Sequence, residues 1–166
     1  MKDTIAICPG SFDPITIGHL DIISRSAKMF SKVIVVVMTN ANKSGGSFTV
    51  EERVEMIKKS VKDIPNVEVD YFGGLLADYA AQKNAKAIIK GLRAVTDFEY
   101  EFQMALTNKK LNPNTETVFL TTRAENMYLS SSMVKQIGSM GGDISDFVPK
   151  SILDKVAKRL QSKSNT

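Results

Sequence analysis

Residues 5–19 read IAICPGSFDPITIGH, and this segment gives the clearest indication of the fold class. Its first four residues form a short apolar run like a buried strand, and a helical pattern begins near Gly18. A loop with one glycine and two prolines joins them. Gly10 lets the backbone approach a ligand closely, and the prolines stiffen the loop. A strand that leads directly into a helix is typical of the parallel α/β class.

The start of this helix is suited to hold an anion. The first N–H groups of a helix have no partner inside it, and they lie at the positive end of its dipole, which favours phosphate. His19, the only histidine of the sequence, would lie at that phosphate. The alternative is an incidental turn with a histidine on the surface.

Further short apolar runs alternate along the chain with segments of helical periodicity. Together with residues 5–8 they predict strands at residues 33–39, 67–72, 87–90 and 117–122. The run 33–37 shows no polar alternation, which indicates a strand covered on both faces. We therefore predict a single Rossmann-like α/β domain, residues 1–161, with a mostly parallel five-stranded sheet and helices on both faces. Residues 162–166 are expected to form a flexible tail.

Capping patterns predict where several helices begin and end. Thr49 stands three residues before Glu52 and Thr96 three residues before Glu99, so each threonine is predicted to cap a helix. A short helix is predicted to start near Ser130 and to end at two glycines, Gly141 and Gly142, and Pro149 opens a last helix. The side chains predicted to face the core are Leu20, Ile23, Ala27 and Phe30; Val50, Val54, Ile57 and Val61; Phe98, Phe102 and Ala105 or Leu106; and Ile152, Val156 and Leu160.

The composition is close to that of an average globular domain. The 166 residues are 43% hydrophobic and 24% charged, which argues against disorder and against a disulfide scaffold. The net charge of +4 lies in residues 150–166, which hold five basic residues and one acidic residue. We interpret this segment as a solvated helix face. A basic stripe with interleaved aromatic residues is absent, so we expect no nucleic acid partner.

Membrane and secretory features are also missing from the sequence. No apolar run approaches the roughly 18 to 20 residues of a membrane span, so no membrane partner is expected. The apolar run before Pro9 is too short for a signal peptide. The lone cysteine, Cys8, cannot form an internal disulfide and is predicted to be a small buried hydrophobe. These features predict a cytoplasmic protein.

Four blocks of the sequence carry a resemblance to a known family. Thr16, Gly18 and His19 resemble the (T/H)xGH signature that nucleotidylyltransferases share with class I aminoacyl-tRNA synthetases, and the chain is too short for a synthetase. The fuller match, over essentially the whole chain, is to the bacterial phosphopantetheine adenylyltransferases. Its blocks are residues 9–19, 49–53 (TVEER), 91–101 (GLRAVTDFEYE) and 130–135 (SSSMVK).

The resemblance implies transfer of AMP from ATP to 4′-phosphopantetheine, which gives dephospho-coenzyme A and pyrophosphate. The nucleophile is a phosphate oxygen that is largely ionised near neutral pH, since its second pKa is about 6. No side-chain base is needed, so catalysis should come from positioning and from cations and N–H groups. The resemblance also implies a homohexamer, feedback binding of coenzyme A, and Mg²⁺ that accompanies ATP, to which we assign no protein ligand.

The resemblance places catalytic and acceptor-binding roles on matching residues. His19, Lys43 and Arg93 would be catalytic: His19 stabilises the α-phosphate, Lys43 brings the acceptor phosphate to it, and Arg93 holds the β- and γ-phosphates. The acceptor would contact Ser11, Lys43, Leu76 and Lys90. Lys90 stands where relatives usually carry arginine, so the charge is kept but the bidentate geometry is lost, and weaker acceptor binding is expected. Taken alone, Lys43 could be merely solvated, Lys90 a strand-end cation and Leu76 a core leucine.

The resemblance also implies an ATP site. Its residues are Ser11, Phe12, His19, Gly91, Leu92, Arg93, Glu101, Asn126, Met127, Tyr128, Leu129, Ser130, Ser131 and Ser132. Asn126 replaces an aromatic residue of some relatives. The alternatives from residue type alone are that a serine of 130–132 only caps a helix, and that Glu101 is one of several exposed helix acids. Phe98, Tyr100 and Phe102 are interpreted as packing residues.

Two other functions compete with this one. A neighbouring nucleotidylyltransferase that uses CTP or nicotinate mononucleotide would share Thr16, Gly18 and His19 but is not expected to share the block 91–101. A nucleotide-binding regulatory module would need affinity without transition-state stabilisation, and the set His19, Lys43 and Arg93 argues against it.

Overall fold

Five parallel strands form the sheet of the computed structural model. The structure describes residues 3–39 and 45–162, except for the side chains of Val95 and Thr96. The strands lie in the order β3-β2-β1-β4-β5, and every neighbouring pair is parallel. Their bounds are β1 Ile5–Gly10, β2 Lys32–Met38, β3 Val67–Phe72, β4 Ala87–Leu92 and β5 Glu116–Thr121. β2 and β3 follow β1 on one side of it, and β4 and β5 then lie on its other side. The strand order therefore reverses between β1 and β4.

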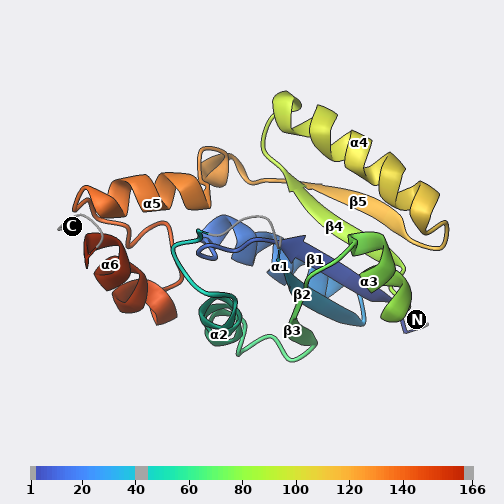
Figure 1. Ribbon diagram of the computed structural model, residues 1–166, viewed down its shortest axis with the longest axis horizontal. Coiled ribbons are helices and arrows are strands. Elements are labelled where there is room, and N and C mark those ends of the chain that lie inside the picture. The colour runs from blue at the N-terminus through green and yellow to red at the C-terminus, as the bar shows by residue number, and fades with distance from the viewer. Residues whose placement is uncertain (1–2, 40–44, 163–166) are drawn as a thin grey trace.

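Helices cover both faces of this sheet (Figure 1). Their bounds are α1 Ile17–Met29, α2 Val50–Ser60, α3 Leu76–Gln82, α4 Val95–Leu111, α5 Ser131–Ser139 and α6 Leu153–Ser162, with the short 3-10 helices η1 Ala124–Asn126 and η2 Lys150–Ile152. The cores contain α1 and α2 side chains on one face and α3 side chains on the other. In the described part of the chain, no helix is both long and apolar enough to cross a membrane.

The alternation of side chains along the strands divides the core into two layers. Val33, Val35 and Val37 of β2 point to the layer of α1 and α2, whereas Ile34 and Val36 point to the layer of α3. All five are buried, as the absence of polar alternation predicts. The predicted fold class is therefore confirmed, and each predicted strand agrees with the structure within two residues at either end.

The predicted helix ends are largely confirmed. Thr49 caps α2 in a capping box with Glu52. Ser130 caps α5, and Gly141, which follows that helix, has a φ of 79° that suits glycine. The cap predicted at Thr96 is wrong, because the N-cap position of α4 lies two residues earlier, at Ala94, which has no capping side chain.

The prediction that α4 buries its large apolar residues is also wrong for this chain alone. Phe98, Phe102 and Leu106 are 40%, 47% and 57% exposed, and Ala105 is only partly buried. The reason is that α4 packs on β4 and β5 at the edge of the sheet and beside α3, so the side of α4 that points away from them stays uncovered. Phe98 contacts the Phe119 ring of β5 with a centroid distance of 5.9 Å, yet stays half exposed.

The C-terminal helix is more closely attached than the predicted solvated face. Ile152, Val156 and Leu160 are buried, as predicted. However, Arg159 pairs with Glu52 and donates to the Ser47 carbonyl at 3.0 Å, and Lys155 pairs with Glu55 at 3.2 Å. These two charges therefore bind α6 to α2 and to the segment before it. Of the predicted tail, Ser162 is the last residue of α6, and residues 163–166 lie outside the described part.

Candidate active site

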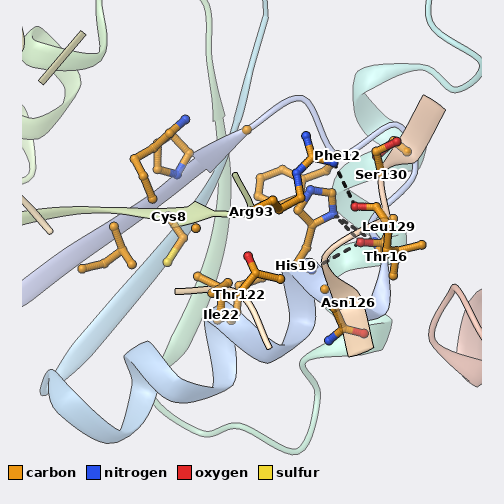
Figure 2. A pocket seen from close by; sticks show the side chains of 18 of the residues that line it. Cys8, Phe12, Thr16, His19, Ile22, Arg93, Thr122, Asn126, Leu129 and Ser130 are labelled. Carbon is orange, nitrogen blue, oxygen red and sulfur yellow. Dashed lines mark hydrogen bonds between the residues drawn. The ribbon is translucent and has the colours of Figure 1, made fainter. Parts of the chain in front are cut away.

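A pocket of about 340 Å³ opens at the carboxyl ends of β1 and β4, where the strand order reverses. In parallel α/β sheets this is the position at which ligands bind. The residues around it come from β1 and the loop after it, from α1 and β4, and from η1 and the start of α5 (Figure 2). They include Ser11, Phe12, Thr16, His19, Lys90, Gly91, Arg93, Glu101, Thr122, Asn126, Leu129, Ser130 and Ser131.

The first turn of α1 fixes the histidine. Thr16 is the N-cap, and its Oγ1 accepts from the His19 backbone N–H at 3.3 Å. In return, the Thr16 backbone N–H donates to His19 Nδ1 at 3.0 Å (Figure 2). This is a capping box with histidine in place of the usual glutamate. Because Nδ1 accepts, the proton of the neutral ring is on Nε2, which makes His19 a hydrogen-bond donor in a pocket suited to an anion.

The surroundings of the imidazole keep it neutral. Burial lowers the pKa of His19 from 6.5 to about 4, and the nearby charges of Arg93 and Lys90 act in the same direction. A neutral ring can donate a hydrogen bond to phosphate without first gaining a proton. The geometry therefore suits His19 to donate a hydrogen bond and does not suit it to act as a base.

The charge state of His19 is the first testable prediction. In the protein without ligand, the imidazole should titrate near pH 4 rather than 6.5. The unfolded chain binds this proton at higher pH than the folded one, so the contribution to stability is full above pH 6.5 and is lost as the pH falls toward 4. The measurement is a long-range ¹H–¹⁵N spectrum, in which a single histidine gives an unambiguous signal. Titration at an ordinary pKa would contradict it.

Two cations at the end of β4 line the same pocket. Arg93 Nη1 donates to the Leu129 carbonyl at 3.0 Å, and its Nε lies 3.4 Å from Asp97. Lys90 Nζ lies 3.4 Å from a carboxylate oxygen of Glu101. Arg93 thus connects the end of β4 to the loop before α5, while Lys90 is already paired. Both remain partly exposed and can meet an anion.

The serines at the start of α5 have structural partners. Ser130 Oγ accepts from the Met133 backbone N–H at 3.1 Å, and Ser131 Oγ donates to the Pro14 carbonyl at 2.7 Å. The reading of Ser130 as a helix cap is therefore correct, and the residue lines the pocket as well. The starts of α1 and α5 line the same pocket, so the positive ends of two helix dipoles lie beside it.

A second, larger pocket of about 780 Å³ adjoins the first. The two share Pro9, Gly10, Ser11, Lys90 and Glu101. The rest of its lining is largely apolar and comes from α3, α4 and the ends of β2 and β3; it includes Met38, Gly73, Gly74, Leu75, Leu76, Ile88, Tyr100, Met104, Ala105 and Leu111. We call the residues that line both pockets the shared wall. The geometry suits a ligand with an elongated, weakly polar arm in the second pocket and a charged group at this shared wall.

Most of the predicted site residues meet around these two pockets. Leu76 lies in the second one, and ten of the fourteen predicted ATP-site residues line the first. Four do not line it: Leu92, Met127, Tyr128 and Ser132. Met127 and Tyr128 are exposed instead. Lys43 lies outside the described residues. The ligand contacts of all these residues remain predictions.

The structure also reveals residues whose part in the site the sequence analysis did not predict. Tyr100, interpreted as a packing residue, is exposed and lines the second pocket. Asp13 is almost fully buried beside the first pocket. Gly10, predicted to allow close approach of a ligand, makes room for the Phe12 ring, because an added Cβ would lie 3.0 Å from Phe12 Cε2. No pattern in the sequence marks such contacts between distant residues.

No group of three or more histidine, cysteine, aspartate or glutamate residues is arranged to hold a metal ion in the described part of the chain. Among the residues that the structure describes, the first pocket holds a single carboxylate, that of Glu101, together with two cations, several hydroxyls and apolar side chains. A metal that enters this site with a polyphosphate would take its oxygen ligands from that ligand and from water.

Comparison with known proteins adds sequence and fold relatives. The family model described as cytidylyltransferase-like matches residues 7–137. The chain is 60% identical over 159 residues to the phosphopantetheine adenylyltransferase of Caldanaerobacter subterraneus subsp. tengcongensis, with 96% of each chain covered. It is 55% identical over 159 residues to the phosphopantetheine adenylyltransferase of Clostridium tetani, with 96% of this chain and 99% of that one covered.

A solved structure shares the fold. The bifunctional NMN adenylyltransferase/ADP ribose pyrophosphatase from Francisella tularensis matches 98% of this chain with a TM-score of 0.70 and 17% identity. This chain spans 50% of that protein's length. At this identity the likeness concerns the fold alone.

Proposed function

Because this chain belongs to the phosphopantetheine adenylyltransferase family, we propose that it transfers the adenylyl group of ATP to 4′-phosphopantetheine, giving dephospho-coenzyme A and pyrophosphate. The observation that carries the proposal is the pair of adjoining pockets. The first holds the cations Lys90 and Arg93 and several hydroxyls among apolar side chains, and it suits a nucleoside triphosphate. The other is larger and mainly apolar and suits the pantetheine arm. The acceptor phosphate and the α-phosphorus would meet at the shared wall, which includes Ser11, Lys90 and Glu101.

The chemistry requires two anions to approach each other. An oxygen of the acceptor phosphate attacks the α-phosphorus, and the bond to the bridging oxygen of the β-phosphate breaks, so that pyrophosphate leaves with the electron pair. No proton needs to be removed, because the acceptor oxygen is already ionised near neutral pH. The chain's part is to position the anions and to offset the charge that develops.

Each described site residue has a defined task in this reaction. His19 donates from Nε2 to the α-phosphate, Arg93 presents its fork to the β- and γ-phosphates, and Lys90 attracts the acceptor phosphate across the shared wall. Ser11 contributes at the same wall. Mg²⁺ enters as part of the nucleotide substrate, with oxygen ligands from the phosphates and water. The role proposed for Lys43 rests on the sequence resemblance.

The direct experiment measures pyrophosphate release from ATP with phosphopantetheine as acceptor. Parallel reactions replace ATP with CTP or replace the acceptor with nicotinate mononucleotide. We expect release only with ATP and phosphopantetheine together. Release with CTP, or with nicotinate mononucleotide at a comparable rate, would reassign the chain to a different reaction, and nucleotide binding without release would support a regulatory module.

The Lys90→Arg substitution is a second prediction. Arginine keeps the charge and adds a bidentate fork, so the KM for phosphopantetheine should fall by about three- to tenfold or stay unchanged, with kcat preserved. Steady-state kinetics at saturating ATP measure this. The matched control is Lys86→Arg, an exposed lysine just before the start of the same strand, which should leave the KM unchanged. A several-fold rise in KM for the Lys90 variant would contradict the proposed contact.

We extend the proposal to assembly, regulation and location. The exposed apolar side of α4, with Phe98, Phe102, Leu106 and Leu111, suits contact with further copies, and the resemblance favours a homohexamer. Light scattering measures the mass. Coenzyme A carries the same pantetheine arm, so it should compete for the second pocket. A cytoplasmic location is supported by the buried free thiol of Cys8, whose pKa burial raises to about 12.

A further inference from the structure

Asp13 is a buried carboxylate in the loop between β1 and α1. It is 6% exposed and lines neither of the two pockets. A carboxylate removed from water is costly unless its oxygens are well paired. The contacts of Asp13 therefore indicate what this position does.

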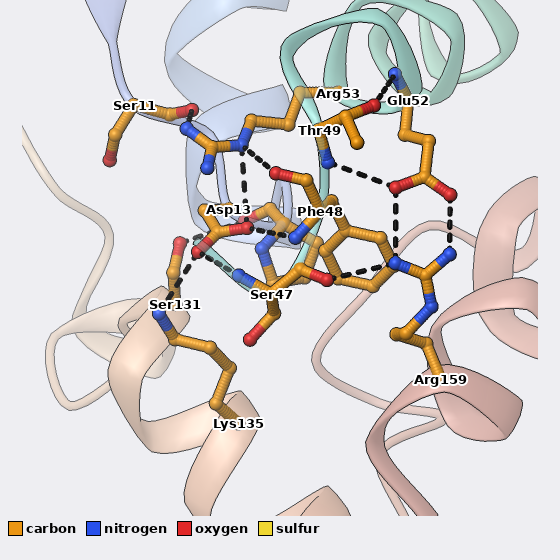
Figure 3. Close-up of polar contacts among 11 residues, drawn as sticks. Ser11, Asp13, Ser47, Phe48, Thr49, Glu52, Arg53, Ser131, Lys135 and Arg159 are labelled. Carbon is orange, nitrogen blue, oxygen red and sulfur yellow. Dashed lines mark hydrogen bonds and ion pairs between the residues drawn. The ribbon is translucent and has the colours of Figure 1, made fainter. Parts of the chain in front are cut away.

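Both oxygens of Asp13 accept hydrogen bonds from the chain segment before α2 (Figure 3). The Ser47 N–H donates to Oδ2 and the Phe48 N–H donates to Oδ1, each at 2.9 Å. Two cations complete the set: Arg53 Nε of α2 lies 3.4 Å from Oδ1, and Lys135 Nζ of α5 lies 3.2 Å from Oδ2. Asp13 thus connects the loop to three separate parts of the structure at once.

The residues on either side of Asp13 are bound to the same elements. Arg53 Nη1 donates to the Ser11 carbonyl at 3.3 Å, and Ser131 Oγ donates to the Pro14 carbonyl at 2.7 Å (Figure 3). The guanidinium of Arg53 is seated so closely that a Cβ on Gly46 would lie 1.7 Å from its Nη2. The backbone of residues 11–14 is therefore held from both the α2 side and the α5 side.

The residue just before Asp13 requires such support. Phe12 has a φ of 47°, in the left-handed region that residues with a side chain seldom adopt. Such a conformation persists where the surroundings fix it. The Phe12 ring is buried and meets the His19 ring edge to face, with 5.1 Å between centroids. The position of Phe12 therefore bears directly on the position of the imidazole.

We propose that Asp13 is a positioning residue for the adenylyl transfer: through its contacts with Ser47, Phe48, Arg53 and Lys135 it fixes the loop that places Ser11 and the Phe12–His19 pair at the reacting phosphates. It does not touch the substrates. The inference rests on the proposed function for its kinetic consequence, whereas its structural consequence, a fixed imidazole, stands without any substrate.

The test is Asp13→Asn. The amide has the same size but a single acceptor oxygen, so it loses one of the two backbone hydrogen bonds and leaves Arg53 and Lys135 without their carboxylate. We expect kcat to fall by about 10- to 100-fold and the KM for ATP to change by less than about threefold. A small misplacement of the reacting groups is sufficient to cause such a loss of turnover. The long-range ¹H–¹⁵N spectrum of His19, recorded without substrate, should keep the Nε2-protonated form that Thr16 fixes, but its ring proton resonances should shift because the Phe12 ring no longer holds its edge-to-face position.

Two further variants separate positioning from stability. Val156→Ala removes buried bulk in α6, away from both pockets, and should lower the melting temperature while leaving kcat and the imidazole spectrum unchanged. Lys135→Gln removes one partner of Asp13 from a partly exposed position, and it serves if Asp13→Asn does not fold. It should lower kcat several-fold at unchanged KM for ATP.

The outcomes are distinct. The positioning role is overturned if Asp13→Asn, or Lys135→Gln as its substitute, keeps kcat within about twofold of wild type and also keeps the wild-type imidazole spectrum. A loss of kcat that Val156→Ala reproduces at an equal melting temperature overturns it as well. A wild-type protein that releases no pyrophosphate overturns the proposed function instead, and the imidazole spectra then still decide whether Asp13 fixes the loop.

Discussion

Replacing His19 with alanine is expected to lower kcat about 10²- to 10³-fold, the usual cost of removing one donor that is aimed at developing charge. The Nε2 proton is free to donate because the Thr16 N–H donates to Nδ1 at 3.0 Å, and the low pKa keeps the ring neutral. ATP should still raise the melting temperature, since Arg93 and the ends of α1 and α5 remain. Pyrophosphate release and thermal unfolding with and without ATP are the measurements.

A second substitution at this position tests the role itself. His19→Gln retains a neutral N–H donor of similar reach and should recover part of the lost turnover at every pH. If the imidazole acted by transferring a proton, glutamine would be as poor as alanine. Turnover of His19→Ala near that of wild type would refute the assigned role.

Replacing Arg93 with alanine is expected to lower kcat/KM for ATP about 10²- to 10³-fold, because a bidentate fork makes two charge-assisted hydrogen bonds worth about 1.5 kcal/mol or more each. The variant also loses the 3.0 Å hydrogen bond to the Leu129 carbonyl, which steadies the loop before α5. Steady-state kinetics with varied ATP measure the effect, and the KM for phosphopantetheine should change much less.

Two matched variants interpret the Arg93 result. Arg93→Lys keeps the charge without the fork and should fall between wild type and alanine. Asp97→Asn removes the carboxylate 3.4 Å from Arg93 Nε and leaves the guanidinium free, so its kcat/KM for ATP should equal or exceed the wild-type value. An Arg93→Ala variant with wild-type kcat/KM for ATP would exclude the arginine from polyphosphate binding.

The strands and the first loop could be predicted because their signals are local. The uninterrupted apolar run of β2 requires cover on both faces, and the 5–19 stretch contains a strand end, a turn and a helix start within a few residues of each other. The pocket then follows from the topology, since parallel strands bring their carboxyl ends to one edge of the sheet. Family resemblance supplied the roles of individual residues.

The remaining features depend on contacts that the sequence does not display. α3 has no capping side chain at Leu75 and only seven residues, so its periodicity is too short to detect. The exposure of Phe98 and Phe102 depends on α4 packing at one end of the sheet, which is a property of the tertiary arrangement. Asp13 looks like an ordinary loop acid until residues 34 and 35 positions away donate to it.

The wall shared by the two pockets has a consequence for the end of the reaction cycle. Each substrate would occupy one pocket, whereas a product that joins the nucleotide to the pantetheine arm would cross the shared wall and occupy both pockets at once. Covalent tethering makes the second attachment intramolecular, so such a molecule dissociates more slowly than either half. A compound that joins both substrates across this span would use the same geometry to act as an inhibitor. Release of the joined product would then be the step that limits kcat.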